Sequence, residues 1–141
     1  MTGGGGLWSA LVLVVEDDPL IGELLTLRLE SSGYRTAWLK DGEAVLNRMA
    51  DIKPQLMVLD LGLPTVDGFQ VLQTLRRNAL WRTLPIIVLT ARHNAEDVKR
   101  ALALGATDYV AKPFDAQPLM KRIERHLTKA GPKLPQTNTW I

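Results

Sequence analysis

The most informative carboxylate of this sequence is Asp60, which directly follows the uninterrupted apolar run Leu56–Leu59. Such a run, with Gly-Leu-Pro after it, is typical of a strand that is buried on both faces. Open parallel sheets bind their ligands beyond the carboxyl ends of the strands, which is where Asp60 is expected to lie. Taken alone, the pattern leaves two roles equally open: a turn or helix-cap residue, or a functional carboxylate.

Three consecutive acids follow a second apolar run. Ala10–Val15 is predicted to be a buried strand, and Glu16, Asp17 and Asp18 come directly after it. Asp18 precedes Pro19, and an Asp-Pro pair is typical of a helix N-cap with proline at the first helical position. We therefore interpret Asp18 as a cap and retain the other two acids as functional candidates.

Two more polar residues stand at the ends of predicted strands, namely Thr90 and Lys112. Two carboxylates about 5 Å apart repel by roughly 3 kcal/mol at an effective dielectric constant of about 20. A cluster of acids therefore needs a cation or a proton, and all-oxygen ligands suit Mg²⁺. Carboxylates, Mg²⁺, a lysine and a hydroxyl are the groups that hold a phosphoryl group, and an aspartate can accept one covalently. The central position of Asp60 makes it the best acceptor.

The elements that must position these residues alternate between strand and helix five times. This order predicts an α/β fold: a (βα)5 doubly wound parallel five-stranded sheet with flavodoxin-like strand order 2-1-3-4-5. In that order strands one, three, four and five are successive neighbours, so their polar ends converge. Leu20, Leu24 and Leu27 are predicted to lie on the apolar face of the first helix, with Ile21 and Leu25 beside them. Strands are expected over 10–15, 34–39, 56–59, 86–89 and 107–111, and helices over 19–30, 43–50, 67–78, 95–104 and 117–129.

Composition indicates one ordinary globular domain of 141 residues, with 46% hydrophobic and 23% charged residues. We expect a flexible N-terminal tail over 1–9, the domain over 10–129, and a linker or C-terminal tail over 130–141. A net charge of +2 gives no argument for nucleic-acid binding, and the absence of cysteine excludes a disulfide scaffold. The run Leu11–Val15 is too short to cross a membrane.

Over residues 10–128 the chain resembles a response-regulator receiver domain, the CheY-like phosphoacceptor domain of two-component signalling. The matching pieces are VVEDD at 14–18, LDLGLP at 59–64, LTA at 89–91 and GATDYVAKPF at 105–114. The resemblance implies that Asp60 is the phosphoacceptor. It further implies roles for seven other residues: Glu16 and Asp17, with Asp60 and the backbone carbonyl of Gly62, bind Mg²⁺; Thr90, Lys112 and Tyr109 bind phosphate or switch; and Pro113 is a candidate cis-proline.

The resemblance also implies what the domain does. A histidine kinase or a histidine phosphotransfer protein would donate the phosphoryl group, and residues 95–129 would switch and contact an effector domain or downstream protein. We expect a cytoplasmic phosphoprotein that is not an enzyme, although it catalyses its own phosphoryl transfer and slow autodephosphorylation. Direct nucleic-acid or membrane binding by this chain is not expected. Related receivers form dimers through charged residues on the last two helices, where this chain has Val98, Thr107 and Pro118. The usual dimer is therefore not expected, and a homodimer of another kind is left open.

Three other functions are alternatives to this interpretation. An Asp-nucleophile phosphatase of the haloacid-dehalogenase type needs a second acid two residues after Asp60, where this chain has Gly62. A flavodoxin-like cofactor binder needs a hydroxyl- and glycine-rich phosphate loop, and the acids 16–18 would repel a phosphate there. An unphosphorylated receiver-like scaffold would not need the complete set of acids. His93 and His126 are expected to be surface residues rather than ligands or phosphocarriers.

Overall fold

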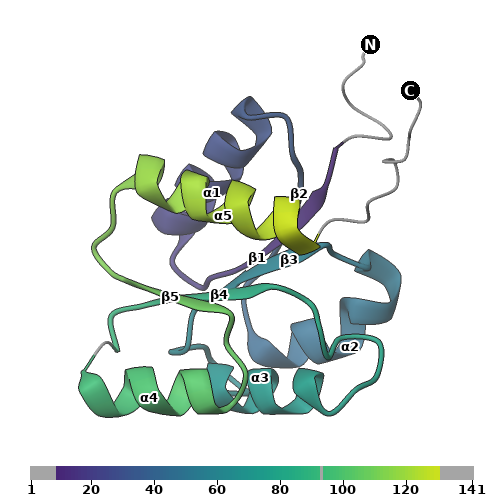
Figure 1. The fold of residues 1–141 in the computed structure, drawn as a ribbon, viewed down its shortest axis with the longest axis vertical. Coiled ribbons are helices and arrows are strands. Elements are labelled where there is room, and N and C mark those ends of the chain that lie inside the picture. Colours follow the sequence, from purple (N-terminus) through teal and green to yellow (C-terminus); the bar gives the residue numbers. More distant parts are fainter. Residues whose placement is uncertain (1–8, 93, 131–141) are drawn as a thin grey trace.

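The computed structural model describes residues 9–92 and 94–130, in which five strands alternate with five helices (Figure 1). The tails predicted over 1–9 and 130–141 lie almost entirely outside the described residues. The elements are β1 (Leu11–Val15), α1 (Pro19–Ser31), β2 (Arg35–Leu39), α2 (Gly42–Ile52), β3 (Leu56–Leu59), α3 (Gly68–Arg76), β4 (Ile86–Thr90), α4 (Ala95–Ala103), β5 (Asp108–Ala111) and α5 (Ala116–Ala130).

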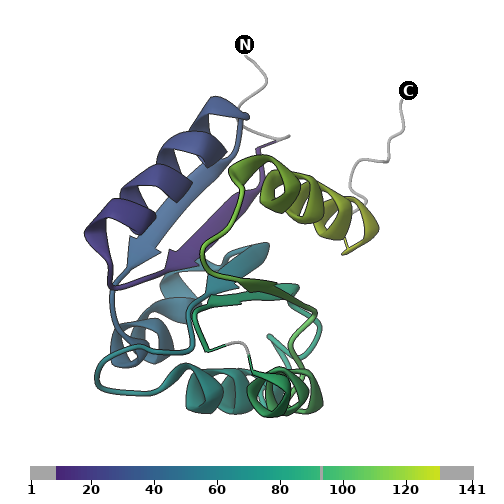
Figure 2. The same ribbon diagram turned by 90° about the vertical axis from the view of Figure 1, so that its left-hand side faces the viewer.

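All neighbouring strands are parallel, and their order is β2-β1-β3-β4-β5, as the sequence predicts. Helices cover both faces of the sheet: α1 and α5 lie on one side, and α2, α3 and α4 lie on the other (Figures 1 and 2). No helix among the described residues is both long and apolar enough to cross a membrane.

The continuous apolar strands are explained by two separate cores. Successive side chains of a strand point to opposite faces, so Leu13 and Val15 join the core under α2, α3 and α4. Val12 and Val14 join the core under α1 and α5. A strand covered on both faces needs an apolar residue at every position, which is the pattern seen in β1 and β3.

The buried face of α1 is centred on the stripe of Leu25, which was predicted to lie beside the main apolar face. Leu20, Leu24 and Leu27 are 77%, 45% and 58% exposed, whereas Leu25 and Leu29 are buried. Leucines occupy two adjacent stripes of this helix, and leucine spacing does not decide between them. Gly22 lies on the stripe that faces the sheet, and its missing side chain lets the helix approach the ring of Trp38 in β2.

A compact charged group joins β5 to α5, and we call it the Asp108 cluster. The Asp108 carboxylate contacts Arg122 at 2.6 Å, His126 at 2.9 Å and Arg125 at 3.5 Å. Burial alone would raise the pKa of Asp108, but the hydrogen bonds from His126, the Tyr109 amide and Arg122 outweigh it and lower the pKa. The His126 side chain is 12% exposed, which is less than the surface position expected for it implies, and His93 lies outside the described residues.

Candidate functional site

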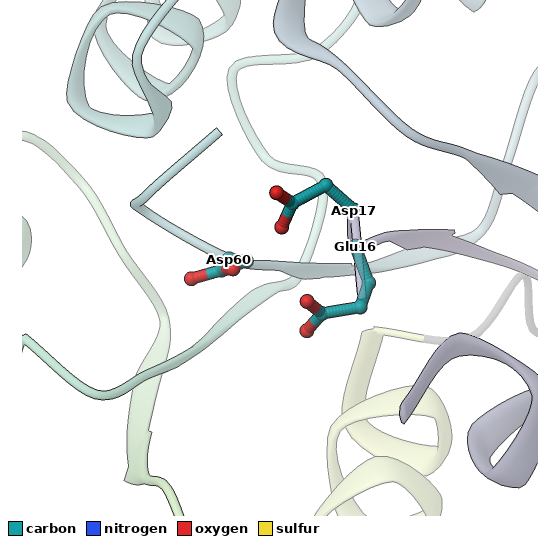
Figure 3. A group of neighbouring side chains, drawn as sticks. All are labelled: Glu16, Asp17 and Asp60. Carbon is teal, nitrogen blue, oxygen red and sulfur yellow. The ribbon is translucent and has the colours of Figure 1, made fainter. Parts of the chain in front are cut away.

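Three carboxylates meet at the carboxyl ends of two neighbouring strands (Figure 3). Glu16 and Asp17 follow β1, Asp60 follows β3, and the last residues of the two strands pair in the sheet. One carboxylate oxygen from each residue lies within 4.8 Å of the others. Glu16 and Asp60 are buried and Asp17 is exposed, so this acid cluster opens to solvent on one side.

The backbone holds the acid cluster firmly. The Asp60 amide donates to the Val15 carbonyl at 3.0 Å, and the Glu16 amide donates to the Leu39 carbonyl at 3.0 Å, which extends the sheet by one residue. The Gly62 amide donates to Asp60 Oδ1 at 3.1 Å.

Asp18 lies outside the cluster. Its carboxylate accepts hydrogen bonds from the amides of Leu20 and Ile21 and caps α1, as its place before Pro19 predicts. Its own amide donates to Glu16 Oε2 at 3.1 Å, so the cap also restrains one acid of the cluster.

Lys112, which follows β5, supplies a positive charge to the acid cluster. Its Nζ lies 2.8 Å from Glu16 Oε1 and 3.3 Å from Asp60 Oδ2. Burial would lower the pKa of Lys112, but the close contact with Glu16 and the charge of Asp60 outweigh it and raise the pKa. For Glu16, burial has the larger effect and raises the pKa, and the Lys112 ammonium and the hydrogen bond from the Asp18 amide offset only part of it.

The acid cluster fits an oxygen-liganded divalent cation. One lysine does not balance three carboxylates, and the raised pKa of Glu16 reflects the cost of a buried anion. Glu16 Oε1 is fully buried and has no hydrogen bond of good geometry, although the Lys112 ammonium is near enough for an ion pair. A buried acceptor with a free lone pair, beside two more carboxylates, is a donor set that suits Mg²⁺.

Thr90 and Tyr109 lie around the loop that follows β4. Thr90 is buried at the end of that strand, its Oγ1 accepts from the Arg92 amide at 3.1 Å, and its carbonyl accepts from the Lys112 amide at 3.0 Å. The Tyr109 hydroxyl donates to the Arg92 carbonyl. The peptide bond before Pro113 is cis. The predicted residues of strands β1, β3, β4 and β5 are therefore brought to one edge of the sheet.

Two features of this edge were missed in the sequence. The Arg92 guanidinium bridges to Asp67 at 3.0 Å and so links the loop after β4 to the start of α3. The Trp38 indole donates to the Glu16 carbonyl at 2.8 Å. A glycine in the interior of a predicted helix often has a packing reason. Gly22 was therefore the one hint in the sequence that a side chain, here Trp38, packs closely against this helix.

The family model of the response regulator receiver domain matches residues 12–124. The chain belongs to this family. Among characterised relatives of the receiver, the transcriptional regulator RpaA of Synechocystis is 37% identical over 125 residues, which is 89% of this chain and 52% of RpaA. The response regulator MtrA of Mycolicibacterium smegmatis is 39% identical over 84% of this chain and 50% of MtrA. The receiver thus spans about half the length of these relatives, both of which are described as DNA-binding.

Solved structures give the same assignment. A putative response regulator from Chloroflexus aurantiacus superposes on this receiver with a TM-score of 0.81 at 33% identity, covering 85% of this chain and 98% of the other. The BeF3-activated N-terminal receiver domain of Klebsiella pneumoniae RstA gives a TM-score of 0.78 at 31% identity, covering 83% and 97%. The chain is therefore a signalling domain of the two-component type.

Proposed function

We propose that this receiver accepts a phosphoryl group on Asp60 from a phosphohistidine of a histidine kinase or of a histidine phosphotransfer protein. The observation that carries the proposal is the convergence of three carboxylates and Lys112 at one sheet edge, with Asp60 at its centre. Asp60 is flanked by the ends of β1 and β4, which gives it neighbours on both sides.

The transfer is a displacement at phosphorus. A carboxylate oxygen of Asp60 forms the new P–O bond while the P–N bond of the donor breaks, and the electron pair of that bond returns to the imidazole. The Gly62 amide and Lys112 hold the two Asp60 oxygens, which leaves the carboxylate little freedom to rotate. A fixed nucleophile loses less entropy on reaching the transition state.

Glu16, Asp17, Asp60 and the Gly62 carbonyl would hold Mg²⁺. When bound, the ion supplies positive charge that offsets the charge on the phosphoryl oxygens during transfer. Lys112 stabilises the product from the β5 side, since its ammonium already pairs with Asp60. The three carboxylates need this compensation before a further anion can approach them.

Thr90 and Tyr109 are proposed to carry the switch. The Thr90 hydroxyl turns towards the new phosphate, the loop after β4 follows it, and Tyr109, whose hydroxyl contacts that loop, repacks. The surface formed by residues 95–129 then presents a changed face to an effector domain or a downstream protein. The relatives named above are DNA-binding regulators, so nucleic-acid binding by a protein that contains this receiver belongs to the proposal. We place this signalling in the cytoplasm.

Intact-mass spectrometry tests the proposal. The chain is incubated with Mg²⁺ and acetyl phosphate, and we expect a single phosphoryl adduct on the wild type and none on Asp60→Asn. Asp108→Asn is the matched control, because it makes the same change at another partly buried aspartate and should keep the adduct. An unmodified wild type would favour the unphosphorylated scaffold, whereas equal adducts on wild type and Asp60→Asn would reject Asp60 as the acceptor and place the phosphoryl group on another residue.

A further inference from the structure

Trp38 makes an unusual contact with the backbone of the acid cluster. It lies near the end of β2, opposite Val14 of β1, and its side chain is half-buried. The indole Nε1–H donates to the carbonyl oxygen of Glu16 at 2.8 Å. This carbonyl belongs to the first residue after β1, and no backbone amide within residues 9–92 and 94–130 donates to it. The indole therefore satisfies a carbonyl that the sheet and α1 both leave free.

Gly22 is what allows the indole to reach that position. A Cβ atom built on Gly22 would lie 2.0 Å from Cζ2 and 2.2 Å from Cε2 of the Trp38 ring, which no real contact permits. The ring thus rests on the helix backbone itself. A glycine inside a helix is less favourable than alanine by about 1 kcal/mol. The close approach of the Trp38 ring to α1 therefore depends on a residue, Gly22, that lowers the stability of the helix itself.

The peptide that accepts this hydrogen bond joins Glu16 to Asp17, the two acids that β1 contributes to the cluster. Rotation of that peptide would move both carboxylates relative to Asp60. The Glu16 amide is fixed to the Leu39 carbonyl, and the Trp38 indole fixes the Glu16 carbonyl at the other end of the residue. Both partners lie in β2, so two neighbouring residues of that strand hold Glu16 at its amide and at the carbonyl that links it to Asp17.

We infer that Trp38 is a positioning residue for the metal site, acting through the Glu16 carbonyl and held in place by the absence of a side chain at Gly22. The inference rests on the proposed function, because it assumes that the acid cluster binds Mg²⁺. Partners that orient metal ligands typically change metal affinity by 10- to 100-fold when they are removed. For a single backbone contact we expect the lower end, a loss on the order of 10-fold.

The first test measures Mg²⁺ dissociation constants by titration of the whole chain, followed by backbone amide NMR shifts. Trp38→Phe removes the N–H donor and keeps an aromatic ring, and we expect Mg²⁺ binding to weaken on the order of 10-fold. Trp81→Phe is the matched control, because Trp81 is also half-buried and packs in the core on the opposite face of the sheet. It should lose comparable stability and keep the wild-type Mg²⁺ affinity. Equal affinities for wild type and Trp38→Phe would overturn the inference while leaving the metal site intact.

The second test needs no variant of Trp38. In the wild type, we expect the indole N–H resonance of Trp38 to move on Mg²⁺ addition with the same midpoint as the amides of Glu16 and Asp17. An indole resonance that does not respond while those amides do would show that Trp38 only packs. A wild type in which neither the amides nor the indole respond to Mg²⁺ would reject the proposed metal site, and the inference with it.

Discussion

The acid cluster and the Asp108 cluster each place buried charge at an end of the sheet, with opposite balances. The acid cluster holds three carboxylates against one lysine, and burial raises the pKa of Glu16. The Asp108 cluster holds one carboxylate against two arginines and a histidine, and the pKa of Asp108 is lowered. An excess of anions leaves capacity for a cation, whereas a carboxylate surrounded by donors is already satisfied. The first arrangement suits ligand binding, and the second fastens α5 to β5.

The largest expected effect comes from removing the only lysine of the acid cluster. Lys112→Met should lower the free energy of unfolding by about 3 kcal/mol in Mg²⁺-free buffer, because it leaves the buried Glu16 without its counter-charge. Saturating Mg²⁺ should restore part of the loss. Urea unfolding followed by circular dichroism, with and without Mg²⁺, measures both values. If Lys112→Met and the wild type are equally stable in Mg²⁺-free buffer, the negative charge of the acid cluster does not need Lys112 as a counter-charge.

The Asp108 cluster should behave as a structural contact. Asp108→Asn should lower the free energy of unfolding by about 1.5 kcal/mol at pH 7, because the hydrogen bond to the charged Arg122 guanidinium is weakened. Mg²⁺ should not restore this loss, in contrast with Lys112→Met. A Mg²⁺-dependent recovery of Asp108→Asn in the same urea experiment would remove the distinction between the two clusters.

The stability difference between wild type and Asp108→Asn should change with pH in a definite direction. The folded-state pKa of Asp108 lies below its ordinary value of about 3.8, so its ionised form stabilises the fold. This contribution is complete above the unfolded-state pKa and is lost as the pH falls through the lower folded-state pKa. The part of the stability gap between wild type and Asp108→Asn that comes from the ionised carboxylate should therefore shrink as the pH falls below about 4. A gap that widened below about pH 4 would contradict the lowered pKa.

Metal binding should stabilise the receiver by mass action. At ten times its dissociation constant, Mg²⁺ should raise the free energy of unfolding by about 1.4 kcal/mol. Asp17→Asn removes one carboxylate from the acid cluster and should lose most of this increment, whereas Asp108→Asn should keep it. Thermal unfolding with and without Mg²⁺ compares the three proteins. Equal increments for wild type and Asp17→Asn would place the ion elsewhere.

The smallest effect is expected at Arg92. Its bridge to Asp67 joins side chains that are 40% and 45% exposed, so solvent screens the pair and Arg92→Gln should cost less than about 1 kcal/mol. Urea unfolding in low and high salt measures this contribution. A larger, salt-insensitive loss would indicate that the stacking of Arg92 on Phe69 matters more than the bridge.

The fold was predictable from sequence because each strand is a short apolar run that stops at a polar residue. Strand order and the meeting of Glu16, Asp17, Asp60, Thr90 and Lys112 at one edge followed from that pattern. Their roles in metal and phosphoryl binding stay predictions.

What the sequence did not predict depends on contacts between distant segments. The buried stripe of α1 includes Gly22, which packs against Trp38, 16 positions later in the sequence. The burial of His126 depends on Asp108, 18 residues earlier. Periodicity within a single helix carries no information about either contact, because each is decided by a side chain on a different element.

Asp60 follows a central strand of the sheet, so its backbone is more restrained than that of Lys112, which follows an edge strand. β3 has a partner on each side, and the Asp60 amide is bonded to β1, so this amide exchanges with solvent only when the centre of the sheet opens. Lys112, its ion-pair partner, follows β5, an edge strand with one neighbour. We therefore expect a change of charge at Asp60 to displace the backbone around Lys112 more than the backbone around Asp60.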